Sequence, residues 1–104
     1  MSVLLELSIF PIGQGTSVSA HVAPVVAMIR ASGHPYQLTA MGTLVETPEL
    51  EQALDLIARA NALLNDQGCE RVYATAKFDI RVGGLGRLDG KVRSVITAIG
   101  DLPA

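Results

Sequence analysis

The chain has 104 residues, a length typical of one domain, and we expect residues 1–104 to fold as a single unit. Apolar residues make up 49% of the sequence and charged residues 17%, so material for a packed core is ample. A net charge of -2, without a cluster of lysine and arginine, argues against nucleic acid as a partner. No stretch reaches the ~20 apolar residues that a membrane-spanning helix needs, which argues against a membrane partner.

The N-terminal residues and the single cysteine favour a cytoplasmic protein. The first residues include no basic region, and Glu6 interrupts their apolar run, so they indicate a strand rather than a signal peptide. Cys69 is the only cysteine, which excludes an internal disulfide and a cysteine-based metal cage. His21 and His34 have neither the spacing nor the acidic companions of a metal site, so we expect no bound metal.

The first predicted strand ends in a polar segment that precedes a helix. Alternating apolar residues predict a strand over residues 3–10. Residues 11–19, PIGQGTSVS, combine two glycines with three hydroxyl side chains. Such a junction can hold a small polar ligand, because glycine lets the backbone approach it and a helix start offers free N–H groups.

Apolar residues at helical spacing predict a helix over residues 17–33. Thr16 or Ser17 can cap its start. Pro24 fits poorly in a helix interior, so we expect either that the regular helix begins near Ala23 or that the helix kinks at the proline.

The middle of the chain predicts a pair of strands and a second helix. Residues 35–40 alternate in polarity, and residues 43–46 follow as a short partner strand after a tight hairpin or bulge at Gly42. The next helix covers residues 48–67, with Thr47 as its expected cap.

The last third predicts a strand and a helix. Residues 71–81 alternate most regularly, residues 83–86 form a glycine-rich loop, and residues 88–99 form a shorter helix. The predicted order is therefore βαββαβ followed by a C-terminal helix. This order is typical of a ferredoxin-like α+β sandwich, in which two helices cover one face of a four-stranded antiparallel sheet.

The opposite face of this sheet is predicted to be polar. A solvated face, a contact between two sheets and the floor of a ligand site all remain possible for it. It is expected to display Glu6, Ser8, Gln37, Thr39, Tyr73, Thr75, Lys77, Asp79 and Arg81.

Three segments together resemble the thiamine-binding protein family. They are residues 11–19, residues 36–46 with the sequence YQLTAMGTLVE, and residues 71–81. The resemblance covers nearly the whole chain in order. It implies a non-catalytic module, without a cofactor, that binds thiamine or its hydroxymethylpyrimidine half. It also implies self-association through the sheets into a dimer or tetramer.

An aminopyrimidine offers an amine donor and ring-nitrogen acceptors, so its site needs a carboxylate or carbonyl facing a hydroxyl or N–H group in a partly apolar slot. The two polar segments could supply these groups from two sides. The predicted ligand-binding residues are Ile12, Gly13, Thr16, Ser17, Val18, Met41, Gly42, Thr43 and Glu46.

Two alternatives of other classes remain open. The first is a structural or regulatory homo-oligomer that binds no ligand. The second is an enzyme acting on a phosphorylated small molecule, because two glycines precede a helix start. The phosphate signal is weak, since the segment has no Gly-Lys-Ser/Thr ending and the chain has no nucleophile with an adjacent base. We therefore expect no catalytic residues.

Overall fold

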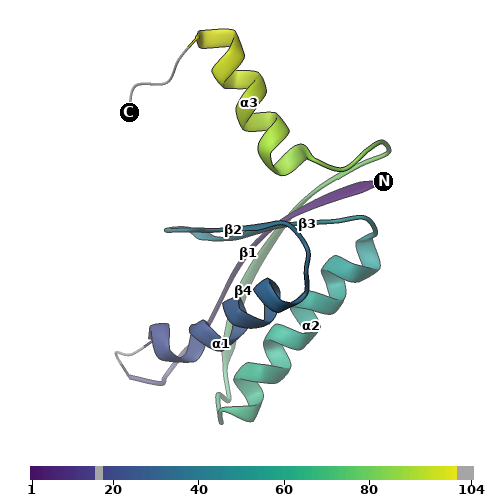
Figure 1. Ribbon diagram of the computed structural model, residues 1–104. Helices are drawn as coiled ribbons and strands as arrows, with labels where there is room; N and C mark the ends of the chain where they lie inside the picture. The colour runs from purple at the N-terminus through teal and green to yellow at the C-terminus, as the bar shows by residue number, and fades with distance from the viewer. Residues whose placement is uncertain (16–17, 101–104) are drawn as a thin grey trace.

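A computed structural model describes residues 1–15 and 18–100 of the chain. The elements are β1 (Ser2–Pro11), α1 (Val18–Ala31), β2 (Tyr36–Thr39), β3 (Gly42–Thr47), α2 (Leu50–Asp66), β4 (Val72–Arg81) and α3 (Arg87–Ile99). The predicted ferredoxin-like fold is confirmed: α1 and α2 cover one face of the sheet, and α3 lies beyond the opposite face (Figure 1). We call this opposite side the open face.

The four strands are antiparallel and lie in the order β2-β3-β1-β4. β1 pairs with β4 along its whole length, from Ser2 with Arg81 to Pro11 with Val72. Its pairing with β3 is shorter and ends where Leu7 meets Thr43. Residues 8–11 of β1 therefore have β4 as their only sheet neighbour within the described chain.

The core lies between the sheet and the two covering helices. Every second residue of β1 faces this side, as strand geometry requires, and meets the apolar stripes of α1 and α2. Burying each large aliphatic side chain contributes about 1.5–3 kcal/mol. The fully buried core side chains include Val3, Leu5, Val25, Ile29, Val45, Leu56 and Leu64.

The start of α1 differs from one of the two sequence-based alternatives. The helix begins at Val18 and contains Pro24, so the expected start near Ala23 is wrong. Proline lacks the N–H that would bond the preceding turn, but packing of Val25 and Ile29 in the core holds the helix together. The capping role expected of residues 16–17 lies outside the described residues.

The predicted cap of α2 is also corrected. Thr47 is the last residue of β3, and its hydroxyl donates to the main-chain carbonyl of Glu49 at 2.8 Å. Glu49 is the N-cap instead, and its N–H donates to the side chain of Gln52 at 3.0 Å. The reciprocal hydrogen bonds between Glu49 and Gln52 satisfy the free N–H groups of the helix start. The helix therefore begins at Leu50, and Pro48 precedes it.

Among residues 1–15 and 18–100, no helix combines the length and apolar character needed to cross a membrane.

Candidate functional site

A cleft with a volume of about 250 Å³ lies between α1 and the β2–β3 hairpin, at the end of the β1–β3 pairing. It is lined by residues 7–10 of β1, residues 38–43 of the hairpin, and Val18, Val22, Val25, Val26 and Ile29 of α1. Binding sites for drug-sized molecules usually have ~300–1,000 Å³, so this cleft matches a smaller ligand or one part of a larger ligand.

The described lining of the cleft contains no aspartate, glutamate, lysine or arginine. A charged group placed there would lose its hydration without gaining a counter-charge, which is costly. The cleft therefore favours a neutral, partly apolar group with a few hydrogen-bonding atoms.

Gly42 closes one end of the cleft by bringing the hairpin against β1. It has a φ of +154°, and a Cβ atom built on it would lie 2.8 Å from the main-chain oxygen of Leu7. A larger residue would push the hairpin away from β1. The turn is fixed by the Thr39 hydroxyl, which donates to the Gly42 carbonyl at 2.8 Å and accepts the Met41 N–H at 3.2 Å.

Thr43 offers a hydroxyl to the cleft. It pairs with Leu7 in the sheet, faces the covered side and is only 6% exposed. Among the described residues, its hydroxyl makes no hydrogen bond, whereas the Thr39 hydroxyl is occupied in the turn. Unlike the Thr39 hydroxyl, the Thr43 hydroxyl is therefore available to a ligand.

The free edge of β1 offers main-chain groups to the same cleft. Beyond Leu7, residues 8–11 have no strand on the β3 side within the described chain. In an antiparallel ladder, the N–H and C=O groups of every second residue point to the same side, so some of these groups point toward the cleft. A carbonyl and an N–H of this kind can pair with an amine and a ring nitrogen.

The structure brings some of the predicted ligand-binding residues together and not others. The cleft is lined by Val18, Met41, Gly42 and Thr43. Ile12 and Gly13 follow β1 and do not line it, and the Ile12 N–H donates to the Arg71 carbonyl at 2.9 Å. Thr16 and Ser17 lie outside the described residues.

The sequence interpretation missed part of the lining. Val22, Val26 and Ile29 were recognisable from their helical spacing, but this pattern marks a core-facing stripe in the same way that it marks a cleft wall. Leu38 alternates like any strand residue. These apolar residues line a cleft because the β1–β3 pairing stops at Leu7 and Thr43, and the sequence does not show where that pairing stops.

Glu46 lies on the other side of the sheet from the cleft. Side chains alternate along β3, so Thr43 and Val45 face the core while Glu46 faces α3. Its carboxylate is 1% exposed. It accepts hydrogen bonds from the N–H groups of Gly86 at 3.0 Å, Arg87 at 3.1 Å and Leu88 at 3.2 Å, and from the Ser2 hydroxyl at 2.6 Å.

Burial raises the pKa of Glu46, but the hydrogen bonds from Ser2 and from the N–H groups at the start of α3 outweigh it and hold the pKa below its ordinary value of 4.5. The carboxylate is therefore ionised at neutral pH. A negative charge at a helix N-terminus satisfies its free N–H groups and its dipole. Glu46 thus acts as a cap for α3, and the structure does not bring it to the predicted site.

Arg87 strengthens this attachment of α3 and was not identified from the sequence. Its guanidinium donates to the Ser2 hydroxyl at 3.0 Å and to the carbonyls of Ser2 and Asp79 at 2.8 and 2.7 Å. It also pairs with the Asp79 carboxylate at 2.9 Å, and Lys91 approaches the same carboxylate at 2.9 Å. Arg87 and Ser2 are 85 positions apart in sequence, so no local sequence pattern indicates their contact.

No group of three or more histidine, cysteine, aspartate or glutamate side chains that could hold a metal ion is found within residues 1–15 and 18–100.

The fold and the cleft define a small ferredoxin-like α+β domain with a charge-free cleft beside its first helix. The chain belongs to the thiamine-binding protein family, whose model matches residues 5–96. This match confirms the family resemblance of the sequence.

Similar proteins match most of the chain. A UPF0045 protein of Methanothermobacter thermautotrophicus is 33% identical over 94 residues, which cover 89% of this chain and 95% of that protein. A solved domain of unknown function from Bacillus cereus is 30% identical, with a TM-score of 0.78 and 88% of each chain covered. A Thermotoga maritima protein, proposed to act in thiamine biosynthesis or salvage, shares the fold with a TM-score of 0.78 and 20% identity, over 91% of this chain and 99% of that one.

Proposed function

We propose that this protein binds thiamine, or the hydroxymethylpyrimidine half of thiamine, in the cleft between α1 and the β2–β3 hairpin. The proposal depends on one observation. The cleft, whose described lining has no charged side chain, contains both the Thr43 hydroxyl, which has no hydrogen-bond partner among the described residues, and the free edge of β1. Membership of the thiamine-binding protein family supports the choice of ligand.

The pyrimidine half of the ligand matches the cleft better than the thiazolium half. An aminopyrimidine is neutral, flat and able to both donate and accept hydrogen bonds. The Thr43 hydroxyl and the β1 main chain can serve these groups from two sides. The thiazolium ring carries a positive charge, for which the described lining has no carboxylate. In this arrangement the thiazolium lies outside the cleft, toward solvent.

A binding role without catalysis agrees with the chemistry of the lining. General acid–base catalysis needs a titratable side chain within hydrogen-bond reach of the reacting group. The described lining has hydroxyl and apolar side chains but no histidine, carboxylate, lysine or cysteine.

We place this binding function in the cytoplasm.

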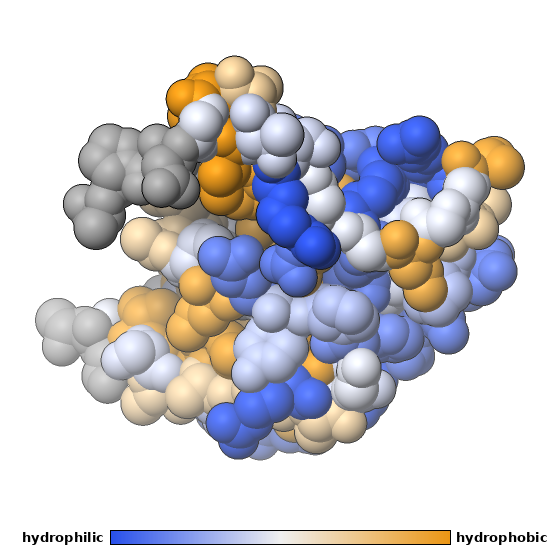
Figure 2. All heavy atoms as spheres, turned by 45° about the horizontal axis from the view of Figure 1, so that its top comes forward, coloured by the Kyte–Doolittle hydropathy of each residue, from blue (hydrophilic) through white to orange (hydrophobic). Residues whose placement is uncertain are grey.

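We propose in addition that the protein self-associates through its sheet, by way of the exposed edge strand β4 and the open face. β4 is an edge strand of ten residues whose side chains are largely exposed, and long edges of this kind favour pairing with another chain. α3 carries exposed apolar side chains at Val92, Val95 and Ile99. In Figure 2, apolar side chains gather at the top of the view, where α3 lies.

Calorimetric titration tests the ligand. Hydroxymethylpyrimidine and thiamine should both bind the wild type. Thr43→Val should weaken binding about two- to tenfold, as expected for a lost hydrogen bond of about 0.5–1.5 kcal/mol. Thr75→Val is the matched control, because Thr75 pairs with Ser8 and is exposed on β4. If neither compound binds at millimolar concentration, the proposal is wrong.

Light scattering tests the assembly. The wild type should exceed the mass of one chain, 10.9 kDa, and Val95→Glu on α3 should return it toward that mass. A wild type that stays monomeric contradicts the assembly proposal. An oligomer that binds neither compound would instead support the alternative of a structural or regulatory assembly without a ligand.

A further inference from the structure

A second hollow adjoins the cleft on the side of α1 that faces β2. It has a volume of about 670 Å³ and lies between α1 and β2, and we call it the side hollow. Its lining includes Ser19, Val22, Val26, Arg30, Tyr36 and Leu38. The volume exceeds that of the cleft, so a ligand too large for the cleft can extend into it.

The cleft and the side hollow are neighbours along α1. Val22, Val26 and Leu38 line both. An α-helix turns about 100° per residue, so the α1 residues of the cleft and those of the side hollow occupy neighbouring faces of the helix. The two valines mark the boundary between these faces, and a ligand passing from one hollow to the other crosses them.

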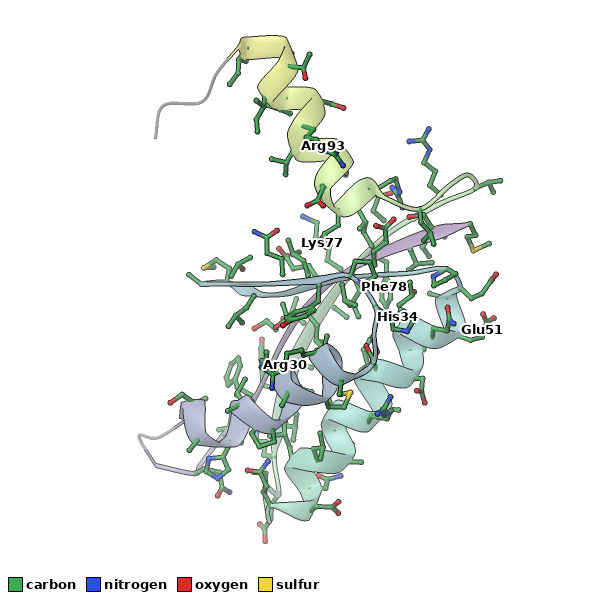
Figure 3. All side chains as sticks on the ribbon, viewed as in Figure 1. Arg30, His34, Glu51, Lys77, Phe78 and Arg93 are labelled. Atoms are coloured by element: carbon green, nitrogen blue, oxygen red, sulfur yellow. The ribbon has the colours of Figure 1, made fainter. Side chains whose placement is uncertain are left out.

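Arg30 is the only charged side chain in the described lining of either hollow. It follows Val26 by one helical turn, and helical side chains lean toward the N-terminus of their helix, so Arg30 leans toward the boundary. Figure 3 shows Arg30 on the side of α1 that faces the sheet. The ion pairs among the described residues use Arg59, Arg87 and Lys91, and none involves Arg30.

Tyr36 lies at the same end of the side hollow. β2 follows α1 after a short turn and runs back beside it, so its first residue, Tyr36, lies next to the last turn of α1. Tyr36 is 36% exposed, and its hydroxyl has no hydrogen-bond partner among the described residues. A guanidinium and a phenol hydroxyl, both able to donate hydrogen bonds, thus line the same hollow.

We infer that Arg30, assisted by Tyr36, recognises a phosphate ester on a ligand whose heteroaromatic ring occupies the cleft. A phosphate supplies the negative charge and the acceptor oxygens that these two donors favour. A thiazolium cation in the side hollow would meet only the positive charge of Arg30, so an ester-free ligand gains nothing from this residue. The inference rests on the proposed function, because it places the ring in the same cleft.

A basic residue in the last turn of a helix also suits the helix dipole. That structural role would leave the preference between a phosphorylated and an unphosphorylated ligand unchanged. The preference itself is therefore the quantity to measure.

Titration calorimetry with hydroxymethylpyrimidine and with its phosphate ester provides the test, and inorganic phosphate is the third probe. The ester should bind the wild type about tenfold more tightly than the free alcohol. Arg30→Gln should bring this ratio close to one without changing the affinity for the alcohol. Tyr36→Phe should lower the ratio less. Arg59→Gln, which changes an exposed arginine of α2 outside both hollows, should leave the ratio intact.

Salt provides a second readout. Affinity for the ester should fall as salt rises, because a charge pair is screened, while affinity for the alcohol should stay constant. Arg30→Gln should remove the salt dependence.

The outcomes separate this inference from the proposed function. If the alcohol binds and the ester binds no more tightly, the phosphate inference is wrong and the proposed function stands. If the ester is preferred equally by the wild type and Arg30→Gln, the assignment to Arg30 is wrong. If neither compound binds, both fall. Binding of inorganic phosphate with an affinity equal to that of the ester would overturn the placement of the ring in the cleft.

Discussion

On the covered face of the sheet, α1 and α2 pack through fully buried apolar side chains such as Val25, Ile29 and Leu56. On the open face, α3 has no buried residue and is held at its N-terminal end by Glu46 and Arg87. The first attachment rests on the hydrophobic effect, which is insensitive to pH. The second rests on hydrogen bonds and charge. α3 is therefore the part of this molecule that solution conditions and single polar substitutions can release without unfolding the rest.

The largest expected effect comes from breaking the covered face. Leu56→Ala should lower the free energy of unfolding by about 2–5 kcal/mol, because it leaves a cavity in the core between α2 and the sheet. Leu54→Ala in the same helix is the control, since Leu54 is 47% exposed. Urea denaturation measures both. Equal losses would mean that α2 does not pack as described.

A smaller effect is expected from breaking the attachment of α3. Glu46→Ala removes the acceptor for three N–H groups and the Ser2 hydroxyl. Water can bond these donors once α3 is released, so the loss is confined to the attachment of α3. Amide hydrogen exchange should accelerate in residues 88–99 and remain slow in β1. Glu6→Ala, an exposed carboxylate of β1, should change neither. Acceleration across all strands would show that Glu46 supports the whole fold.

Lowering the pH should release α3 in the wild type. The pKa of Glu46 lies below 4.5 when α3 is attached, and the released state binds the proton more readily. Attachment is therefore fully stabilised above about pH 4.5 and is lost as the pH falls through the lowered pKa. NMR of α3 amides between pH 7 and 3 measures this.

Glu46→Gln should remove most of this pH dependence. Lys91 and Arg87 also lower the pKa of Asp79, so a residual dependence of the same sign should persist and vanish on further change of Asp79→Asn. An unchanged pH profile in Glu46→Gln would rule out Glu46 as the controlling group.

The smallest effect is expected for Lys91→Ala. The ammonium of Lys91 pairs with the Asp79 carboxylate at 2.9 Å, but its side chain is 60% exposed, and exposed pairs contribute little. Hydrogen exchange of α3 should change less than in Glu46→Ala, and the difference from the wild type should disappear in high salt. If hydrogen exchange of α3 accelerates as much as in Glu46→Ala, the exposed ion pair and not the buried cap holds α3 in place.

The order of the elements and the fold could be predicted because periodicity is a local property. The alternation of residues 71–81 and the helical spacing of Val22, Val25 and Ile29 each mark an element directly. The caps were less predictable, because Thr47 and Glu49 both suit a helix start and only the end of β3 decides between them.

The cleft could be predicted in part. Val18 and Thr43 were placed near each other from the order of elements, and the structure puts both in the lining. Glu46 was grouped with Thr43 because it is close in sequence. Side chains alternate between the two faces of a sheet, so residues three positions apart in a strand face opposite sides. Glu46 therefore faces α3, while Thr43 faces the cleft. Arg30 gave no signal, since its importance depends on how β2 runs back along α1.

The contacts of Glu46 also constrain the order in which the chain assembles. They join Ser2 in β1, Glu46 in β3 and the segment after β4, so they span 44 and 41 positions in sequence. These contacts cannot form until all three strands are paired, because closing such long loops costs entropy that only the finished sheet offsets. α3 therefore attaches last. Substitutions at its N-terminal end should speed unfolding and leave the rate of folding nearly unchanged.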